Sequence, residues 1–308
     1  MELRQLRYFV RIVELGGMGR AALEFGVATA ALSQQINRLE RELGVSLLSR
    51  QSKGAVPTEA GSAFYRKAQL VLRHADDAIG AARRPTLTGR VSIGLTQATA
   101  GILGGPLYRA MQERYPEVRL HLVEAFSGFL LTMLEARQLD LAILFRPPVA
   151  NDAKAAPLLK ERLFAICSPA ATHAFSGANL KLEELAGIPL ILPSRAHGLR
   201  VLLDTAFSQH GLTPLIAAEV DSLGMLLEAV RLGYGATIQQ SAVAARPPVA
   251  GLSFAQISDA GMRLQNFLVS LPQDELSPAA AGACEAIRDV ATNMVNRRQW
   301  IGASLSDP

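Results

Sequence analysis

Polar side chains of the kind that bind DNA recur on one face of a predicted helix near the N-terminus. Gln34, Asn37 and Arg38 share that face when the chain is helical. Arginine, glutamine and asparagine form hydrogen bonds with base edges in the major groove, and arginine also binds phosphate. The opposite face is apolar at steps of four, three and four residues, which predicts that it is buried. Its residues are Leu32, Ile36, Leu39 and Leu43.

The elements before this helix decide whether it reads DNA or is an ordinary amphipathic surface helix. A short helix is predicted from about Arg20 to Phe25, and Gly26 suits the left-handed turn that ends it. The polar-faced helix then opens near Thr29. An earlier amphipathic helix completes a three-helix core through Leu6, Phe9, Val10 and Val13. Two helices joined by such a turn can place the second one in the major groove of DNA.

After these helices, the sequence predicts a β-hairpin and then a long helix. The segment VSLLSRQSKGAVPTEAG follows Gly44 and places a basic tip between two short runs, which is typical of a β-hairpin wing. Residues 59–84 contain no proline and carry an apolar heptad seam. The seam consists of Phe64, Ala68, Val71, Ala75, Ala78 and Ala82. Two copies of this helix can pair along the seam, or the helix can pack on its own chain. Pro85 then begins a hinge.

The excess of positive over negative charge lies wholly in this N-terminal part. Residues 1–90 hold 14 Lys and Arg against 8 Asp and Glu, whereas the remainder holds 17 against 19. Such an excess is expected where phosphate contacts supply affinity, although soluble domains that bind no nucleic acid also have basic surfaces. The length of 308 residues and the apolar content of 49% predict two or three folded domains. Without a run of 18 apolar residues or a secretory signal, we expect a cytoplasmic protein with no membrane partner.

The C-terminal two-thirds of the chain has an α/β signature. Beyond Gly89, short apolar runs alternate with helical patterns, and the series closes with a strand at 267–271 and a helix over about 278–298. We expect two lobes, each with a mostly parallel sheet, that close on a small molecule by hinge motion. Lobe I is expected over about 89–161 and 267–308, and lobe II over about 162–266.

A ligand between such lobes would lie at the carboxyl ends of strands, near helix N-termini whose free N–H groups favour anions. The polar residues that follow predicted strands are Thr96, Gln97, Thr99, Ser127, Gly128, Ser194, Arg195 and Gln239, with Gly128 included for its backbone. Arg200 lies a little further along and is placed to reach a carboxylate. We therefore predict a small acidic effector. The alternative for each residue is that it only caps a helix or faces solvent.

Catalytic and metal-binding patterns are missing from the sequence. There is no G-x-S-x-G, no P-loop and no dinucleotide-binding glycine motif, and the five histidines show no i,i+4 pair. Cys167 and Cys284 have no metal spacing and are interpreted as buried free thiols. His197 falls in the predicted cleft, where it either titrates near neutral pH or is simply solvated. We expect no enzyme activity, no cofactor and no metal. An exported solute-binding protein is disfavoured by the basic N-terminal part.

The chain resembles the LysR-type transcriptional regulators over nearly its whole length. The resemblance rests on LRYFVRIVELGG, ALSQQINRLERELGVSLLSR and PTEAG, and it continues through GRVSIGL, YPEVRLHLVEA, LEARQLDLAIL and AVRLGYGATIQQSAV. Within the family, the chain is most similar to the nitrogen assimilation control type, which can act without an effector. The resemblance implies a winged helix-turn-helix over 1–58, a linker and dimerisation helix over 59–88, and a two-lobed effector domain similar to periplasmic binding proteins over 89–308.

The same resemblance implies the partners of the protein and the residues that contact DNA. The partners would be a double-stranded DNA operator, RNA polymerase, a small-molecule effector and further copies of the chain in a homodimer or homotetramer. Groove contacts are expected from Thr29, Ala30, Ser33, Gln34, Asn37 and Arg38, and backbone or minor-groove contacts from Arg50 and Lys53.

Departures from the family pattern fall on the DNA-binding helices. The family usually has Gln-Pro where Thr29 and Ala30 stand, and Ser or Thr where Gly17 and Gly19 stand. Threonine offers one hydrogen bond and a contact to a thymine methyl group, whereas glutamine binds adenine through two hydrogen bonds. We therefore expect DNA binding with an altered sequence preference.

Overall fold

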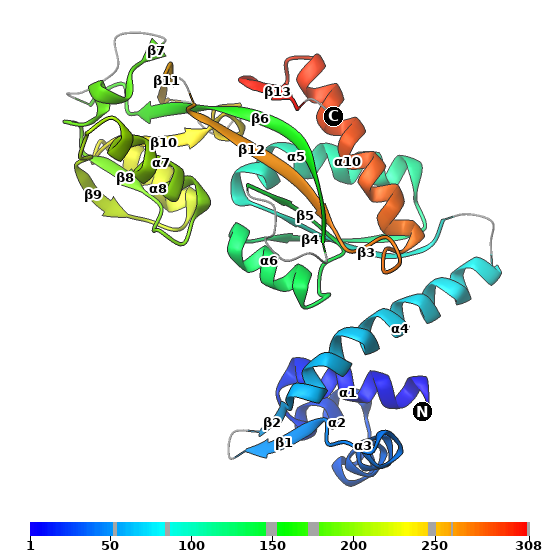
Figure 1. Cartoon of the computed structure of the whole chain (residues 1–308). Coiled ribbons are helices and arrows are strands. Elements are labelled where there is room, and N and C mark those ends of the chain that lie inside the picture. The colour runs from blue at the N-terminus through cyan, green and yellow to red at the C-terminus, as the bar shows by residue number, and fades with distance from the viewer. Residues whose placement is uncertain are drawn as a thin grey trace. The chain divides into compact units, whose positions relative to one another are not determined.

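The chain forms two compact units, Met1–Gly89 and Arg90–Pro308 (Figure 1). The computed structural model describes residues 1–51, 54–83, 87–145, 153–171, 179–245, 251–259 and 261–306. No helix within these ranges is long and apolar enough to cross a bilayer.

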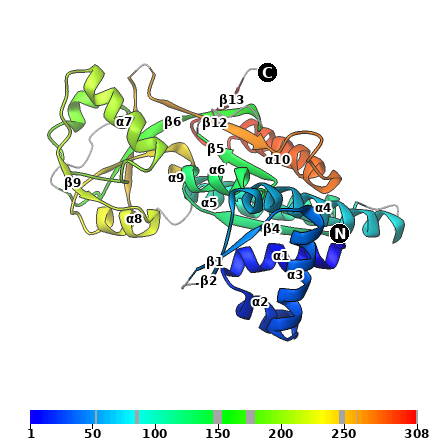
Figure 2. The same ribbon diagram turned by 60° about the horizontal axis from the view of Figure 1, so that its bottom comes forward.

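The N-terminal unit contains the predicted helices followed by a hairpin. Its elements are α1 (Leu3–Leu15), α2 (Met18–Phe25), α3 (Thr29–Leu43), the antiparallel strands β1 (Leu48–Gln51) and β2 (Gly54–Pro57), and α4 (Glu59–Arg83). Gly26 ends α2 with a left-handed φ of 65°, and its N–H bonds the carbonyls of Ala22 and Leu23. Figure 2 shows the hairpin projecting from the α1–α3 bundle. The predicted helix-turn-helix and wing are therefore confirmed.

The apolar face of α3 packs into the core of this unit. Leu32, Ile36 and Leu39 are buried against Leu6 and Phe9 of α1, as their spacing predicts. Leu43 is 37% exposed, so its predicted burial is wrong. It stands in the last turn of α3, and Leu39 is the last residue of this helix in the buried cluster.

The predicted heptad seam lies on α4, and its earlier and later residues differ in burial. In its first half, Ala68 is buried, and the Phe64 ring lies 5.3 Å from the ring of Phe9 in α1. These two seam residues therefore pack on their own chain and are not free to pair with a second copy. Further along, Val71 is 42% exposed. The side chain of Ala82 and the predicted hinge at Pro85 lie outside the described residues.

The C-terminal unit has two lobes joined by two long strands, β6 (Lys154–Cys167) and β12 (Arg263–Ser270). Lobe I contains β3 (Gly89–Leu95), α5 (Gln97–Arg114), β4 (Val118–Glu124), α6 (Ser127–Glu135), β5 (Leu141–Leu144), α10 (Pro278–Asn296) and β13 (Ala303–Leu305). Lobe II contains β7 (Asn179–Leu180), the 3-10 helix η1 (Leu182–Leu185), β8 (Leu190–Leu192), α7 (Gly198–Gln209), β9 (Ile216–Glu219), α8 (Leu223–Arg231), β10 (Thr237–Gln240) and β11 (Ser253–Ile257). The short helix α9 (Ser241–Ala244) follows β10 and packs against α5 of lobe I and against β6.

The expectation of mostly parallel sheets is wrong for the strands that join the lobes. The main sheet has the order β4-β3-β5-β12-β6-β11-β7, and β12 pairs antiparallel with both β5 and β6. Strands β10 and β11 also pair antiparallel with β6. The chain crosses between the lobes once in each direction, so the two crossing strands that lie side by side run in opposite directions (Figure 1). Parallel pairing remains within the lobes, between β3 and β5, and between β8 and β9.

The lobe boundaries predicted at 161/162 and 266/267 both fall inside the crossing strands. The register of β6 with β12 shifts between Asn266 and Phe267, which is the signature of a β-bulge. The passage between the lobes is therefore a hydrogen-bonded ladder with one irregular position.

Candidate DNA-binding surface and ligand crevice

The polar face of α3 is open to solvent. Thr29, Ala30, Gln34, Asn37 and Arg38 are exposed, and Ser33 is half-buried. The side chain of Arg38 is 62% exposed, and its Nη1 lies 3.9 Å from Oε1 of Glu2. These side chains are therefore accessible from outside the unit, as a base-reading helix requires.

A groove of about 410 Å³ runs between α3 and the hairpin. The predicted residues Thr29, Ala30, Ser33 and Asn37 line it together with Met18, Ile36, Glu40, Leu48, Gly54 and Ala55. Gln34 and Arg41 line a shallower neighbouring groove that also includes Asn37. The backbone of Arg50 pairs with Ala55 in the hairpin, but its side chain and the whole of Lys53 lie outside the described residues.

Glu40 fixes the hairpin to α3, a role that the sequence alone did not predict. Its Oε1 accepts hydrogen bonds from the backbone N–H groups of Leu47, at 2.7 Å, and Leu48, at 3.0 Å. Next to it, the Thr58 hydroxyl donates to the carbonyl of Ser46 at 2.7 Å. These hydrogen bonds therefore fix the position of the wing relative to the exposed polar face of α3.

A small crevice lies between the two lobes of the C-terminal unit, at the beginnings of α5, α6, α7 and α8. Its volume is about 40 Å³, which is room for about three water molecules. Four of the predicted ligand residues line it, namely Thr96, Gln97, Ser127 and Gln239. Further lining residues were not assigned from the sequence, or, for His197, were left open, and these are Phe126, His197, Asp221, Leu223 and Gln240.

The remaining predicted ligand residues do not line the crevice. Thr99 is fully buried, and its hydroxyl bonds the hydroxyl of Thr96 at 2.9 Å. Ser194 donates to the Asp221 carboxylate from its backbone N–H, at 2.8 Å, and from its hydroxyl, at 3.0 Å. Gly128 lies in the first turn of α6, and Arg195 pairs with Asp204 at 3.1 Å.

Arg200 is held inside lobe II, away from the crevice. Its Nη1 donates to Glu219 at 2.7 Å and to the carbonyl of Pro193 at 3.0 Å, while its Nε donates to Asp204 at 2.8 Å. Only 5% of the side chain is exposed. Two carboxylates of its own lobe thus neutralise the guanidinium, so the structure does not support the predicted contact to a ligand carboxylate.

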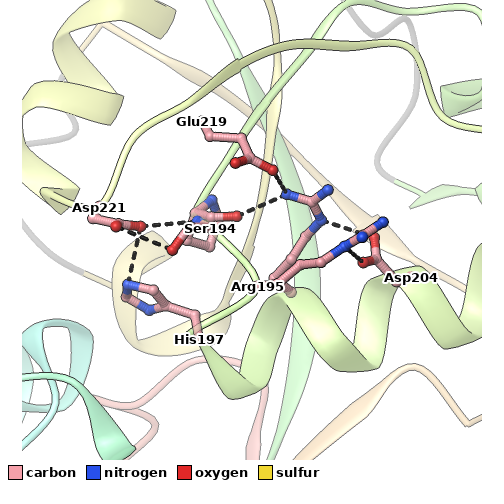
Figure 3. Close-up of polar contacts among 8 residues, drawn as sticks. Ser194, Arg195, His197, Asp204, Glu219 and Asp221 are labelled. Atoms are coloured by element: carbon pink, nitrogen blue, oxygen red, sulfur yellow. Dashed lines mark hydrogen bonds and ion pairs between the residues drawn. The ribbon is translucent and has the colours of Figure 1, made fainter. Parts of the chain in front are cut away.

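Asp221 and His197 form the polar wall of the crevice in lobe II. Hydrogen bonds from the backbone N–H and the hydroxyl of Ser194 lower the pKa of Asp221, and burial opposes this shift. His197 Nε2 lies 3.5 Å from the Asp221 carboxylate (Figure 3). Burial lowers the pKa of His197, and the charge of Asp221 partly offsets that effect. Because Asp221 stands between Ser194 and His197, the three residues are not arranged as a nucleophilic triad, in which His contacts Ser directly.

Two family models match the chain. The bacterial regulatory helix-turn-helix protein, lysR family, matches residues 3–62, and the LysR substrate binding domain matches residues 85–292. The nitrogen assimilation regulatory protein nac of Klebsiella aerogenes is 35% identical over 302 residues, covering 96% of this chain and 96% of the relative. Its counterpart from Escherichia coli (strain K12) is 34% identical over 306 residues, covering 97% and 99%.

Solved structures of regulators share the fold. A full-length point variant of OxyR from Pseudomonas aeruginosa has a TM-score of 0.77 at 21% identity, covering 100% of this chain and 99% of that chain. Full-length CbnR complexed with its target DNA has a TM-score of 0.67 at 24% identity, covering 94% and 100%. The relatives are transcriptional regulators and not enzymes. With both family models matched in order, the chain belongs to the LysR family of DNA-binding transcriptional regulators.

Proposed function

We propose that the protein binds an operator of two-fold symmetry by inserting α3 into the major groove and placing the wing beside it. The observation that carries this proposal is the open polar face of α3, which shares a groove with the hairpin. Thr29, Ala30, Ser33, Gln34, Asn37 and Arg38 contact the groove of DNA, and Arg50 and Lys53 contact the backbone or the minor groove. The excess of basic residues before residue 90 adds phosphate contacts.

A second copy of the chain supplies the second recognition helix. The exposed later half of α4, with Val71, Ala78 and Ile79 on its surface, is the surface for pairing. Paired helices would set the two α3 elements on half-sites about one helical turn apart, or a multiple of it. Assembly of dimers into a tetramer and contact with RNA polymerase complete this proposal. Because its target is chromosomal DNA, the protein acts in the cytoplasm.

The effector of the C-terminal unit is small and anionic, or no effector is needed. The convergence of helix N-termini at the crevice supports an anion, which backbone N–H groups bind. Neither Lys nor Arg occurs among the described residues that line the crevice, so charge pairing contributes little. The small volume favours the second candidate, a regulator that acts without an effector. The 35% identity to a nitrogen assimilation regulatory protein supports the same candidate.

A gel-shift titration with the DNA upstream of the protein's own gene tests the proposed function. The purified chain is titrated at two salt concentrations against this DNA and against random competitor. We expect saturable, competitor-resistant binding that weakens with salt, because phosphate contacts release counterions. Equal affinity for this DNA and for random DNA would contradict specific binding there, and a selection from random sequences then decides whether any operator is recognised.

A further inference from the structure

A side chain of lobe I occupies the N-terminus of a helix in lobe II. Gln97, the first residue of α5, accepts a hydrogen bond on its Oε1 from the backbone N–H of Leu223, the first residue of α8, at 2.9 Å. The first N–H groups of a helix have no partner within the helix. Gln97 therefore supplies, from across the crevice, an acceptor that α8 lacks.

A ring contact bridges the lobes beside this hydrogen bond. The ring centroids of Phe126 and His197 lie 4.1 Å apart in an edge-to-face arrangement. Phe126 immediately precedes α6 of lobe I, and His197 immediately precedes α7 of lobe II. Burial at this contact lowers the pKa of His197, as expected when the imidazole is removed from water.

Several of the groups that an anion would bind in this crevice are already bonded to the protein itself, although the buried Ser127 hydroxyl and His197 Nε2 have no hydrogen-bond partner among the described residues. The N–H of Leu223 donates to Gln97, and the N–H and hydroxyl of Ser194 donate to Asp221. Asp221 also places a negative charge on the crevice wall. The remaining space of about 40 Å³ is far below the volume of about 300 Å³ or more that small-molecule sites usually offer.

We propose that Gln97 and Phe126 latch lobe I to lobe II, so that the C-terminal unit adopts its closed state without a small molecule. A ligand that displaces the Gln97 side chain must offer its own hydrogen-bond acceptor to the N–H of Leu223. The role of this latch in regulation rests on the proposed function. Closure itself can be measured without DNA.

Hydrogen exchange of the full-length protein, read by mass spectrometry, tests the latch. Gln97→Met keeps the length of the side chain and removes the acceptor, whereas Gln97→Glu keeps an acceptor. With Gln97→Met, we expect about ten-fold faster exchange, the factor for losing one hydrogen bond, in the first turn of α8. Exchange also rises across the crevice at the start of α6, because the lobes separate. Gln97→Glu restores slow exchange at both places.

Ser222→Ala is the matched control for fraying of α8 alone. The Ser222 hydroxyl accepts from the N–H of Met225 at 3.4 Å and so caps the same helix within its own lobe. This variant should speed exchange in α8 and leave the start of α6 unchanged. If Gln97→Met leaves exchange unchanged, or gives only this local pattern, the latch is refuted.

Native mass spectrometry of the wild-type protein checks that no bound small molecule holds the lobes closed. A measured mass equal to that of the polypeptide chains, with no added ligand, supports the latch. A bound small molecule whose removal speeds exchange at both α6 and α8 overturns it. Gel shifts of the same preparations report DNA binding separately, so a failed latch and a failed proposed function give different results.

Discussion

Asn266 Nδ2 donates a 2.9 Å hydrogen bond to Oε1 of Glu161, and this bond joins the two strands that cross between the lobes. Oε2 of the same buried carboxylate accepts from the Ser241 hydroxyl at 2.9 Å, the Ala242 N–H at 2.6 Å and Trp300 Nε1 at 3.1 Å. Burial raises the pKa of Glu161, and these four donors oppose the rise. One carboxylate thus ties β6 to β12, to α9 and to the segment after α10.

Glu161→Ala should lower the free energy of unfolding by about 3 kcal/mol or more, because it leaves several buried donors without an acceptor. Trp300 is the only tryptophan of the chain, so its fluorescence reports directly on this cluster. Urea unfolding followed by that signal gives the measurement. Glu285→Ala, at an exposed position of α10, should change stability by no more than about 0.5 kcal/mol. If the two substitutions lower the free energy of unfolding equally, the hydrogen bonds of buried Glu161 add no stability beyond that of an exposed side chain.

Arg38→Ala should weaken operator binding by roughly 1–3 kcal/mol if the guanidinium reads a base. The loss on random DNA would then be much smaller, and quantitative gel shifts on both DNAs separate the two effects. A loss of the same size on both DNAs would assign Arg38 to phosphate. Arg119→Ala removes the same charge from an exposed position of β4 in the C-terminal unit and serves as the control.

Glu40→Ala should reduce affinity for the operator, although it changes none of the residues that we expect to contact DNA. The loss of one acceptor for two backbone N–H groups frees the start of the hairpin from α3. Stability should fall by about 1–3 kcal/mol. Glu40→Gln retains a carbonyl oxygen and should recover most of both losses, as measured by thermal unfolding and gel shift. An operator affinity that stays at the wild-type value in Glu40→Ala would disprove the positioning role.

Val71→Glu should convert the proposed dimer to a monomer, because pairing along α4 would bury one carboxylate from each chain at the seam. Sedimentation velocity at several protein concentrations provides the measurement. Ala63→Glu adds the same charge to α4 at an exposed position outside the seam and should remain dimeric. A dimer that survives Val71→Glu would locate the interface elsewhere.

Acidification should weaken closure of the crevice through His197. Burial holds its pKa below the ordinary value of 6.5, so the closed state binds fewer protons than the open state between the lowered pKa and that value. The stabilisation is therefore complete above about pH 6.5 and is lost as the pH falls through this interval. NMR titration should show a higher pKa in Phe126→Ala, which solvates the ring, and a lower one in Asp221→Asn, which removes the favourable charge. An unchanged pKa in both variants would contradict this account.

The helices and the wing of the N-terminal unit could be predicted because their signals are local. The apolar steps of α3 and the turn at Gly26 are visible within a few residues. The same reasoning overestimated the heptad seam, since periodicity shows which residues form a stripe but not which partner covers it. Phe64 meets Phe9, far away in the sequence.

Some polar contacts of the C-terminal unit could also be predicted from the sequence, and others could not. Arg200 and Asp204 stand four residues apart on one helix, so their ion pair was readable in advance and could have corrected the assignment of Arg200 to a ligand. The proximity of Ser194 and Asp221 follows from the parallel pairing of β8 and β9, the strands that precede them. In contrast, the bond from Leu223 to Gln97 depends on how far the lobes close, which no local pattern encodes.

The two crossing strands, β6 and β12, couple the motions of the two lobes. Because a hydrogen-bonded ladder joins the lobes, we expect the crevice to open by twisting of this ladder, most easily at its irregular position beside Asn266. We expect this paired connection to restrict the opening of the lobes more than a single flexible linker would. Each lobe contains only part of β6 and part of β12, so a fragment that ends between the lobes would leave the sheet of each lobe incomplete.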